Sequence, residues 1–432
     1  MRICVTVVGT HGDVLPMLAL AAGLKRAGHH VRFATAPLYE KQVCDTGVEF
    51  YPIVGSPQSF FGGRVGTELR NMCSHPKNFQ RFWNLCIAPY ARENLRQTWE
   101  ACKGFDAAVC IPWFNAAPSL SEKLDMPCFA TTVMPALGMP TGAFPNPMEE
   151  TPPNGLGYRR SWRSSTLIAA APFEQVNEWR VGTLGLRAQS RIEAIRAYRN
   201  TNFLLSYSSS VLPTPTDWPQ SVHVTGFWLP EPQTDWQPSA ELERFLDADP
   251  APIMVGFSSQ VARDPKTFTE NVTKAVIRSG KSAILLTGWG GLRQTDLPPN
   301  ILIQKFIPYD WIVPRLSGFL HHGGCGSMAM CLRHGIPSMA IPFGFDQMLW
   351  GARIAELGLG PAPMNPEQID VNVLADSLVR MTEDPGIKER VQTMSRKIRS
   401  EDGVRSAVSA MEKAMGVSSP TNKTNAFQLA EI

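Results

Sequence analysis

The sequence predicts an α/β protein with two similar parallel-sheet domains that face each other across a central cleft. Three observations carry this prediction. Strand-like apolar segments alternate with helix-like segments in both halves of the chain, which is typical of parallel sheets. The alternation stops near mid-chain at a polar, proline-rich stretch, LPEPQTDWQPS, and then starts again. The length of 432 residues suits two domains of ordinary size.

In the first half, a strand, a glycine-rich turn, a helix and a second strand follow one another, which is the unit of a parallel α/β sheet. Residues 134–172 break the pattern because Pro, Gly and Asn are dense there. Long irregular segments in compact domains often bind ligands. We expect strands at residues 3–8, 31–35, 107–111, 128–132, 203–207 and 222–224, and helices at 15–27, 116–123, 174–182 and 189–198.

The second half repeats the alternation, and a ligand is expected in the cleft between two such domains. Its expected strands are residues 253–257, 282–286, 301–306, 318–321 and 338–341, with helices at 268–279, from 328, at 348–357 and through most of 371–415. The predicted domains are 1–228 and 240–415, with a linker at 229–239 and a loose tail at 416–432.

The composition excludes several classes of protein. Net charge is +3, from 41 Lys and Arg against 38 Asp and Glu, so we expect no nucleic-acid partner. The start, MRICVTVVGT, lacks the layout of a signal peptide, and no apolar run is long enough to cross a bilayer. Nine cysteines without a CxxC pair indicate reduced thiols. We therefore expect a cytoplasmic protein with no integral membrane segment.

The strongest chemical signal is a glycine-rich turn, HHGGCGS, between an expected strand and an expected helix. Glycines let the backbone approach an anion closely, and a helix N-terminus supplies unpaired N–H groups. His322 and Ser327 add donors, so the turn is a candidate diphosphate site that needs no metal. From the glycines alone, a plain tight turn is an equal alternative. A zinc site is disfavoured because no Cys or His pair has the usual spacing.

Two further turns carry carboxylates. Asp346 and Gln347, in PFGFDQ, offer acceptors and donors that suit sugar hydroxyls. His11 and Asp13, in GTHGDVLP, are two candidate general bases. Both aspartates have a structural alternative, because each stands where it could simply cap the helix that follows.

Taken together, these turns resemble the nucleotide-sugar glycosyltransferases of the GT-B fold, and most closely the sterol 3-beta-glucosyltransferase-like branch of the UDP-glycosyltransferase superfamily. The resemblance implies two Rossmann-like domains, with the acceptor site in the first and the donor site in the second. The matching stretches are GTHGDVLPMLAL at 9–20, NEWRVGTLGL at 177–186, DWPQSVHVTGFW at 217–228, GWGGL at 288–292, DWIVPR at 310–315, HHGGCGS at 321–327 and PFGFDQMLWGARIAELGLGP at 342–361.

The resemblance also implies a role for each matching residue. Asp13 stands where the family has its catalytic base, and His11 is a second candidate for that role. The donor-site residues implied are Ser258, Ser259, His322, Gly324, Gly326 and Ser327 for the diphosphate, Trp289, Phe306 and Trp311 for the nucleobase, and Asp346 and Gln347 for the sugar. The departures from the family pattern are His11 for Arg, Cys325 for Ala, Ser327 for Thr, and the reversed order Gly344-Phe345.

The irregular segment and the aromatic stretch before it supply candidates for the acceptor site. Exposing their many Met, Phe and Trp side chains to water would be costly. An apolar acceptor pocket explains them, and a small core under long loops is an equal alternative. The resemblance favours the pocket, with the candidate acceptor residues Phe82, Trp83, Met134, Phe144 and Trp162.

The sequence therefore predicts an inverting glycosyltransferase acting on an apolar small molecule such as a sterol, terpenoid, polyketide or lipid. By resemblance the donor is UDP-glucose, with a dTDP-sugar as second choice. No metal and no cofactor beyond this co-substrate is expected, and an apolar acceptor leaves room for peripheral membrane contact. Two alternatives stay open: a non-hydrolysing sugar-nucleotide epimerase, which needs no acceptor site, and a catalytically inactive glycosyltransferase-like helper protein.

Overall fold

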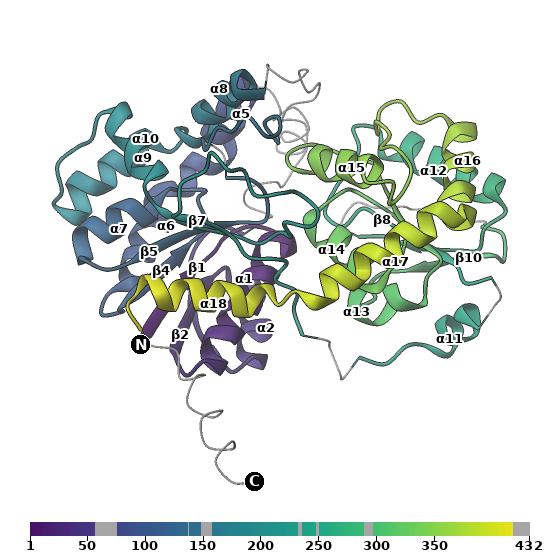
Figure 1. Cartoon of the computed structure of the whole chain (residues 1–432), viewed down its shortest axis with the longest axis horizontal. Coiled ribbons are helices and arrows are strands. Elements are labelled where there is room, and N and C mark those ends of the chain that lie inside the picture. Colours follow the sequence, from purple (N-terminus) through teal and green to yellow (C-terminus); the bar gives the residue numbers. More distant parts are fainter. Residues whose placement is uncertain are drawn as a thin grey trace, which may run out of the picture.

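The chain forms two lobes, each built on a parallel sheet with helices packed on it (Figure 1). The computed structural model describes residues 1–56, 76–136, 138–147, 158–231, 236–247, 250–288 and 297–417. The prediction of two parallel-sheet domains is confirmed. Among the described residues, no helix combines the length and the apolar character that crossing a membrane requires.

The first sheet has the strand order β3-β2-β1-β4-β5-β6-β7, and all of its neighbouring strands are parallel. Its order reverses between β1 and β4, which is the switch point where ligands bind in doubly wound sheets. The strands are β1 (Arg2–Thr6), β2 (His30–Thr35), β3 (Glu49–Pro52), β4 (Ala107–Cys110), β5 (Cys128–Thr132), β6 (Asn202–Leu205) and β7 (Val222–Val224).

The described part of the first lobe has four helices that the sequence did not predict, at Glu40–Asp45, Pro76–Phe82, Ala88–Cys102 and Tyr158–Ala169. The expected irregular segment contains α8, because Tyr158–Ala169 follows the dense Pro and Gly region and forms an amphipathic helix. The helices are α1 (His11–Arg26), α2 (Glu40–Asp45), α5 (Pro76–Phe82), α6 (Ala88–Cys102), α7 (Ala116–Leu124), α8 (Tyr158–Ala169), α9 (Phe173–Trp179) and α10 (Arg191–Arg199), with π-helical turns at Trp83–Ile87 and Arg180–Leu184.

The second sheet has the order β10-β9-β8-β11-β12, with its switch point between β8 and β11. Its strands are β8 (Ile253–Gly256), β9 (Ala283–Leu286), β10 (Ile301–Gln304), β11 (Gly318–His321) and β12 (Ser338–Ala340). The helices of this half of the chain are α11 (Ala240–Leu246), α12 (Pro265–Ser279), α13 (Tyr309–Ile312), α14 (Cys325–His334), α15 (Gln347–Glu356), α16 (Val371–Glu383), α17 (Pro385–Ser400) and α18 (Gly403–Ala414).

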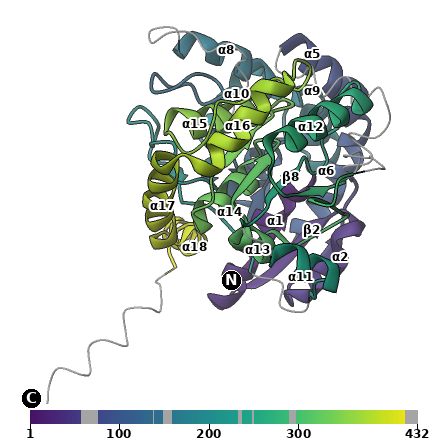
Figure 2. The same ribbon diagram turned by 90° about the vertical axis from the view of Figure 1, so that its right-hand side faces the viewer.

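The last helix returns to the first lobe. Figures 1 and 2 show α17 and α18 lying nearly end to end along one flank, with α18 beside α1. Ala407 and Met411 of α18 are fully buried in the apolar core of the first sheet. A buried contact joins His29 Nε2 to Glu412 Oε1 at 3.2 Å. Although α18 falls inside the predicted 240–415 domain, it therefore packs with the first one.

Side chains also join the two lobes directly. The rings of Tyr207 and Trp350 lie 5.5 Å apart, and the Arg353 guanidinium donates two hydrogen bonds to the carbonyl of Val211. Ser208 Oγ donates to Glu401 Oε1 at 2.7 Å. These contacts place the carboxyl ends of the two sheets in a fixed relation to each other. The boundaries of the linker at 229–239 and of the tail stay predictions.

Candidate active site

The catalytic candidates follow the strands on either side of both switch points. The turn with His11 and Asp13 follows β1, and Trp113 follows β4. In the other lobe, Ser258 follows β8 and the HHGGCGS turn follows β11. Helices α1 and α14, which begin at these turns, contact each other across the lobes. The fold therefore brings the predicted base and the predicted diphosphate turn to one cleft.

The turn after β1 is closed by its own side chains. Thr10 caps α1, while the Asp13 carboxylate accepts hydrogen bonds from the Thr10 backbone N–H at 2.8 Å and from its hydroxyl at 3.2 Å. This is a capping box, so Asp13 is the third helical residue and not the cap itself. A Cβ on Gly9 would lie 2.3 Å from Asp13 Oδ2, which explains the glycine. The helix consequently starts at His11, four residues before its predicted start.

Asp13 has the environment of a general base. Its side chain is partly exposed, but surrounding protein atoms desolvate it and raise its pKa to about 6. Hydrogen bonds from Thr10 and from the Trp113 indole act in the opposite direction, since they stabilise the carboxylate. A carboxylate with a pKa close to the working pH is suited to accept a proton from an alcohol.

A small, largely apolar recess of about 250 Å³ lies beside Asp13. Residues of α1 and β5 border it, together with residues that follow β4, β5, β6 and β7. An alcohol bound there would have mostly hydrocarbon around it and one carboxylate within the recess. The lining residues are Asp13, Pro16, Met17, Ile111, Thr131, Thr132, Val133, Ser206 and Trp228.

His11 lies next to Asp13 in the sequence but packs elsewhere. Its ring makes an edge contact with Tyr39 at 5.2 Å between ring centroids. Burial lowers the pKa of His11, so the imidazole is predominantly neutral at pH 7. The base role of His11 stays a prediction, and its contacts make Asp13 the better-placed candidate.

The turn after β11 lacks the side-chain capping that the turn after β1 has. Helix α14 begins at Cys325 with Gly324 as its cap, and no capping side chain is present among the described residues. Its first-turn N–H groups therefore receive no capping side-chain acceptor, which is the condition that an anion site at a helix N-terminus requires. A Cβ on Gly324 would lie 2.4 Å from His322 Nε2, so the imidazole lies directly over this glycine.

The other three side chains of the turn, those of His321, Cys325 and Ser327, are buried. Ser327 is buried and hydrogen-bonds to the hydroxyl of Tyr309. His321 is fully buried and its Nδ1 accepts the Gly323 backbone N–H at 2.9 Å. Burial, followed by the nearby His322, lowers the pKa of His321 to about 3, which keeps its imidazole neutral. These contacts hold the shape of the turn and leave His322 and the amides around Gly324 and Gly326 to face a ligand.

Asp346 and Gln347 open helix α15 without capping it through a side chain. Asp346 is the N-cap residue by position, but its Oδ2 accepts a hydrogen bond from Trp350 Nε1 at 2.8 Å and none from the first-turn N–H groups. Gln347 Oε1 accepts the Phe343 backbone N–H at 2.8 Å. That bond fixes the Gln347 side chain and uses its carbonyl oxygen, while the NH₂ group keeps its capacity to donate.

The two carboxylates of the cleft interact with each other. Desolvation raises the pKa of Asp346 to about 7, and the negative charge of Asp13 adds to this shift. Asp13 belongs to the first lobe and Asp346 to the second, so their interaction shows that the two lobes bring both groups into one electrostatic environment. A sugar held by Asp346 would accordingly lie near a hydroxyl held at Asp13.

The remaining predicted donor residues lie on the second lobe. Ser258 is exposed with a φ of 55°, and Ser259 follows it in the loop after β8. Phe306 is 60% exposed, which leaves its ring available to a planar base. Trp311 is flanked by Arg315 and by the ring of Trp236. Trp289 lies outside the described residues.

The predicted acceptor residues separate into two groups. Phe82 and Trp83 are buried in the first-lobe core that contacts Phe345 from the second lobe. Met134 is partly buried against a second core, which also contains Phe144 and Trp162. Trp162 is 1% exposed, and its indole donates to the Phe144 carbonyl. This pair matches the alternative of a small core, and an acceptor role for either ring stays a prediction.

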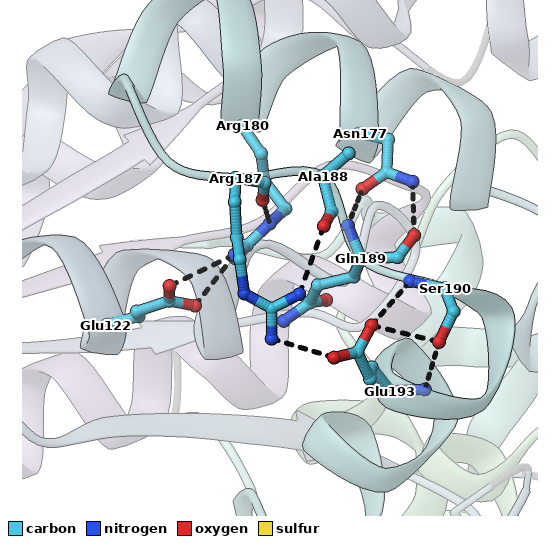
Figure 3. Close-up of polar contacts among 8 residues, drawn as sticks. All are labelled: Glu122, Asn177, Arg180, Arg187, Ala188, Gln189, Ser190 and Glu193. Carbon is cyan, nitrogen blue, oxygen red and sulfur yellow. Dashed lines mark hydrogen bonds and ion pairs between the residues drawn. The ribbon is translucent and has the colours of Figure 1, made fainter.

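Sequence reasoning missed Trp113, although this residue comes shortly after the strand predicted at residues 107–111. Figure 3 shows a polar network that fixes the helix after it. The buried Arg180 donates to Ser119 and forms an ion pair with Glu122, both on α7, and it also donates to the Arg187 carbonyl. The network therefore anchors α7, and with it the loop that carries Trp113.

The possibility of a resident metal was tested on the same residues. In the described part of the chain, no three or more His, Cys, Asp or Glu side chains converge in a way that could hold an ion. The eight cysteines that the structure describes are free thiols.

Comparisons with known protein families agree with this geometry. Residues 3–138 match the N-terminal domain of glycosyltransferase family 28, and residues 289–413 match the C-terminal domain of the erythromycin biosynthesis protein CIII-like family. The two matched regions carry the base turn and the diphosphate turn respectively.

Curated relatives cover almost the whole chain. Sterol 3-beta-glucosyltransferase UGT80A2 of Arabidopsis thaliana is 30% identical over 434 residues, which cover 98% of this chain and 67% of the relative. A sterol 3-beta-glucosyltransferase of Penicillium rubens is 29% identical over 95% of this chain and 30% of its own length. The chain thus spans about two thirds of the plant relative and less than a third of the fungal one.

Solved structures share the fold. The glycosyltransferase of kitacinnamycin aligns with a TM-score of 0.70 at 18% identity, over 96% of this chain and 99% of that one. The calicheamicin glycosyltransferase CalG4 aligns with a TM-score of 0.68 at 21% identity, over 97% and 99%. The chain therefore belongs to the GT-B nucleotide-sugar glycosyltransferases, in the branch related to the sterol 3-beta-glucosyltransferases. The GT-B prediction is confirmed.

Proposed function

We propose that this glycosyltransferase moves glucose from UDP-glucose to a hydroxyl group of a sterol or a sterol-like apolar alcohol. The observation that carries the proposal is the meeting of three groups at one cleft: the Asp13 carboxylate, the uncapped N-terminus of α14, and Asp346. The sterol acceptor is supported by the names of the relatives and by the largely apolar recess beside Asp13.

In the proposed reaction, the acceptor oxygen attacks the anomeric carbon of glucose as the bond from that carbon to the β-phosphate oxygen breaks. Asp13 takes the hydroxyl proton, and the bonding pair leaves with UDP. The charge that develops on UDP is stabilised by the α14 amides and by His322. One such displacement inverts the anomeric configuration. Asp346 and the Gln347 amide would hold the sugar hydroxyls during the transfer.

The test is incubation of the protein with UDP-glucose and a panel of alcohols. The panel contains cholesterol, a terpenoid alcohol, a polyketide phenol and a polar control, glycerol. The proposal predicts a β-glucoside of the sterol, detected by mass spectrometry and by its anomeric proton coupling, and none with Asp13→Asn. Transfer to glycerol alone would contradict the apolar acceptor. Conversion of UDP-glucose to an epimer without any acceptor would favour the epimerase alternative, and no turnover with intact UDP binding would favour the helper protein.

A cytoplasmic site for this reaction is also part of the proposal. It is supported by the nine cysteines, of which the eight that the structure describes are free thiols. Fractionation of the native cells with detection of the protein tests it, and recovery only with secreted material would contradict it.

A further inference from the structure

Phe345 has an unusual backbone for an aromatic residue. It precedes Asp346 in the loop between β12 and α15, and its φ is 56°. A side chain is disfavoured in this left-handed region, which is why glycine is common there. The family pattern has Phe-Gly before the Asp-Gln pair, and this chain has the reverse order. A ring therefore stands at a position where the pattern has none, and its contacts must offset the strain.

The contacts of the Phe345 ring are with the opposite lobe. Its centroid lies 6.4 Å from that of Phe82 and 6.3 Å from that of Trp113, with interplanar angles of 69° and 77°. Both are edge-to-face geometries, which stabilise aromatic pairs beyond the area they bury. Phe82 and Trp113 belong to the first lobe, whereas Phe345 comes from the second, so this ring crosses the cleft.

Trp113 connects this contact to the base. Its indole hydrogen-bonds to the Asp13 carboxylate, and its ring packs on Phe345. On the other side, Phe345 is bonded in the chain to Asp346, the candidate sugar-binding carboxylate. An unbroken series of contacts thus runs from the base of one lobe to the sugar site of the other. The anchored α7 helix holds the Trp113 end of the series.

We propose that Phe345 is a positioning residue, whose ring docks the Asp346 loop onto the first lobe and holds Trp113 against Asp13. This inference rests on the proposed glycosyl transfer with Asp13 as base. In a single displacement, the acceptor oxygen and the anomeric carbon must be aligned, and small misplacements have large effects on rate. Phe345 would supply that alignment without touching either substrate.

The experiment compares three variants of the full chain with UDP-glucose and the sterol. Phe345→Gly relieves the backbone strain and removes the ring, Phe345→Leu keeps an apolar side chain without the ring, and Phe345→Tyr keeps the ring. For Gly and Leu we expect kcat to fall at least about tenfold while the Kd for UDP stays within about twofold. Tyr should restore kcat.

The pH profile distinguishes positioning from simple packing. The Trp113 hydrogen bond lowers the pKa of Asp13, so losing it should move the acid limb of kcat/KM to higher pH, by about half a unit or more. The matched control is Phe268→Leu, whose ring packs only against Phe257 and Phe343 of the second lobe among the described aromatic contacts. It should lower the Tm and leave the acid limb in place.

The outcomes separate this inference from the proposed function. Suppose that the wild type and Phe268→Leu both produce glucoside. If Phe345→Gly and Phe345→Leu then keep both the wild-type kcat and the wild-type acid limb, the positioning role is wrong and the proposed function stands. If the wild type binds UDP but makes no glucoside with any acceptor, the proposed function itself fails. A fall in Tm without a shift of the acid limb would also overturn the positioning role.

Discussion

The two turns that meet in the cleft occupy equivalent places in the two lobes, but one has a capped helix N-terminus and the other an uncapped one. Each connects a central parallel strand to a helix at a switch point, β1 to α1 in the first lobe and β11 to α14 in the second. In the first, Thr10 and Asp13 satisfy the backbone and each other through a capping box. In the second, Gly324 supplies no side chain, and the first-turn amides stay open.

The difference explains how one fold serves both a base and an anion site. A capped helix N-terminus has less affinity for an added anion, because its N–H groups already have acceptors. What the capped turn presents instead is a carboxylate held in one rotamer, with a raised pKa. The uncapped turn presents donors and the positive end of the helix. Substitutions that affect one turn and not the other test this division directly.

The largest effect is expected at the capped turn. Asp13→Asn preserves the shape and an acceptor for Thr10 but cannot take a proton, so turnover should fall about 100-fold or more. In the wild type, kcat/KM should decline as pH drops through about 6, because a protonated Asp13 is no longer a base. Steady-state kinetics of the variant measure this. If His11→Ala abolishes turnover and Asp13→Asn does not, the base has been assigned to the wrong residue.

The next effect concerns the sugar. Asp346→Ala removes the acceptor for buried sugar hydroxyls, which costs about 1–3 kcal/mol. Calorimetry should therefore show weaker binding of UDP-glucose and almost unchanged binding of UDP. Equal losses for both ligands would place Asp346 away from the sugar and would leave the uncapped turn as the sole source of donor affinity.

A smaller effect is expected from filling the space above Gly324. An added Cβ would lie 2.4 Å from His322 Nε2 and must displace the imidazole. Gly324→Ala should weaken UDP binding about tenfold, in line with the loss of one charge-assisted contact. The matched control is Gly182→Ala, whose Cβ would meet nothing within 4 Å. Unchanged UDP affinity in Gly324→Ala would show that the position of His322 is irrelevant to the diphosphate.

The smallest expected effect is a change in the thermal stability of the protein, and the direction of this change follows from the pKa of Asp346. Burial and Asp13 raise the pKa of Asp346 to about 7 in the folded protein, above its ordinary value of 3.8. The folded state therefore holds the proton more tightly, and stability is lost as pH rises between these values. Asp346→Asn should raise the Tm by roughly 2–4 °C at pH 8 and not at pH 4. An equal Tm difference at both values would contradict the raised pKa.

The sequence predicted every described strand except β3, because the others are short apolar runs bounded by turns. Strand β5 and strand β11 match the predicted limits, and Asp13, His322, Asp346 and Gln347 were identified before their contacts were known. Residues 158–169 were predicted as irregular, because the neighbouring Pro and Gly residues obscured a helical pattern. The start of α1 was placed late, because Asp13 was interpreted as a cap when Thr10 holds that place.

Other features depend on contacts between lobes, which no local pattern reveals. The left-handed backbone of Phe345 is disfavoured by its own side chain, and two rings from the other lobe, Phe82 and Trp113, pack against that side chain. The bond between Trp113 and Asp13 joins loops about a hundred residues apart in the chain. Desolvation raises the pKa of Asp346, and the charge of Asp13 from the opposite lobe adds to that rise.

The most direct test of the division between the turns is a calorimetric titration of UDP into the wild type in the presence of EDTA, with Asp13→Asn and His322→Ala alongside. If the uncapped turn itself holds the diphosphate, the wild type binds UDP in chelator, Asp13→Asn binds it equally well, and His322→Ala binds it about tenfold more weakly. Binding that disappears in EDTA and returns with magnesium, or that falls in Asp13→Asn but not in His322→Ala, would contradict the account.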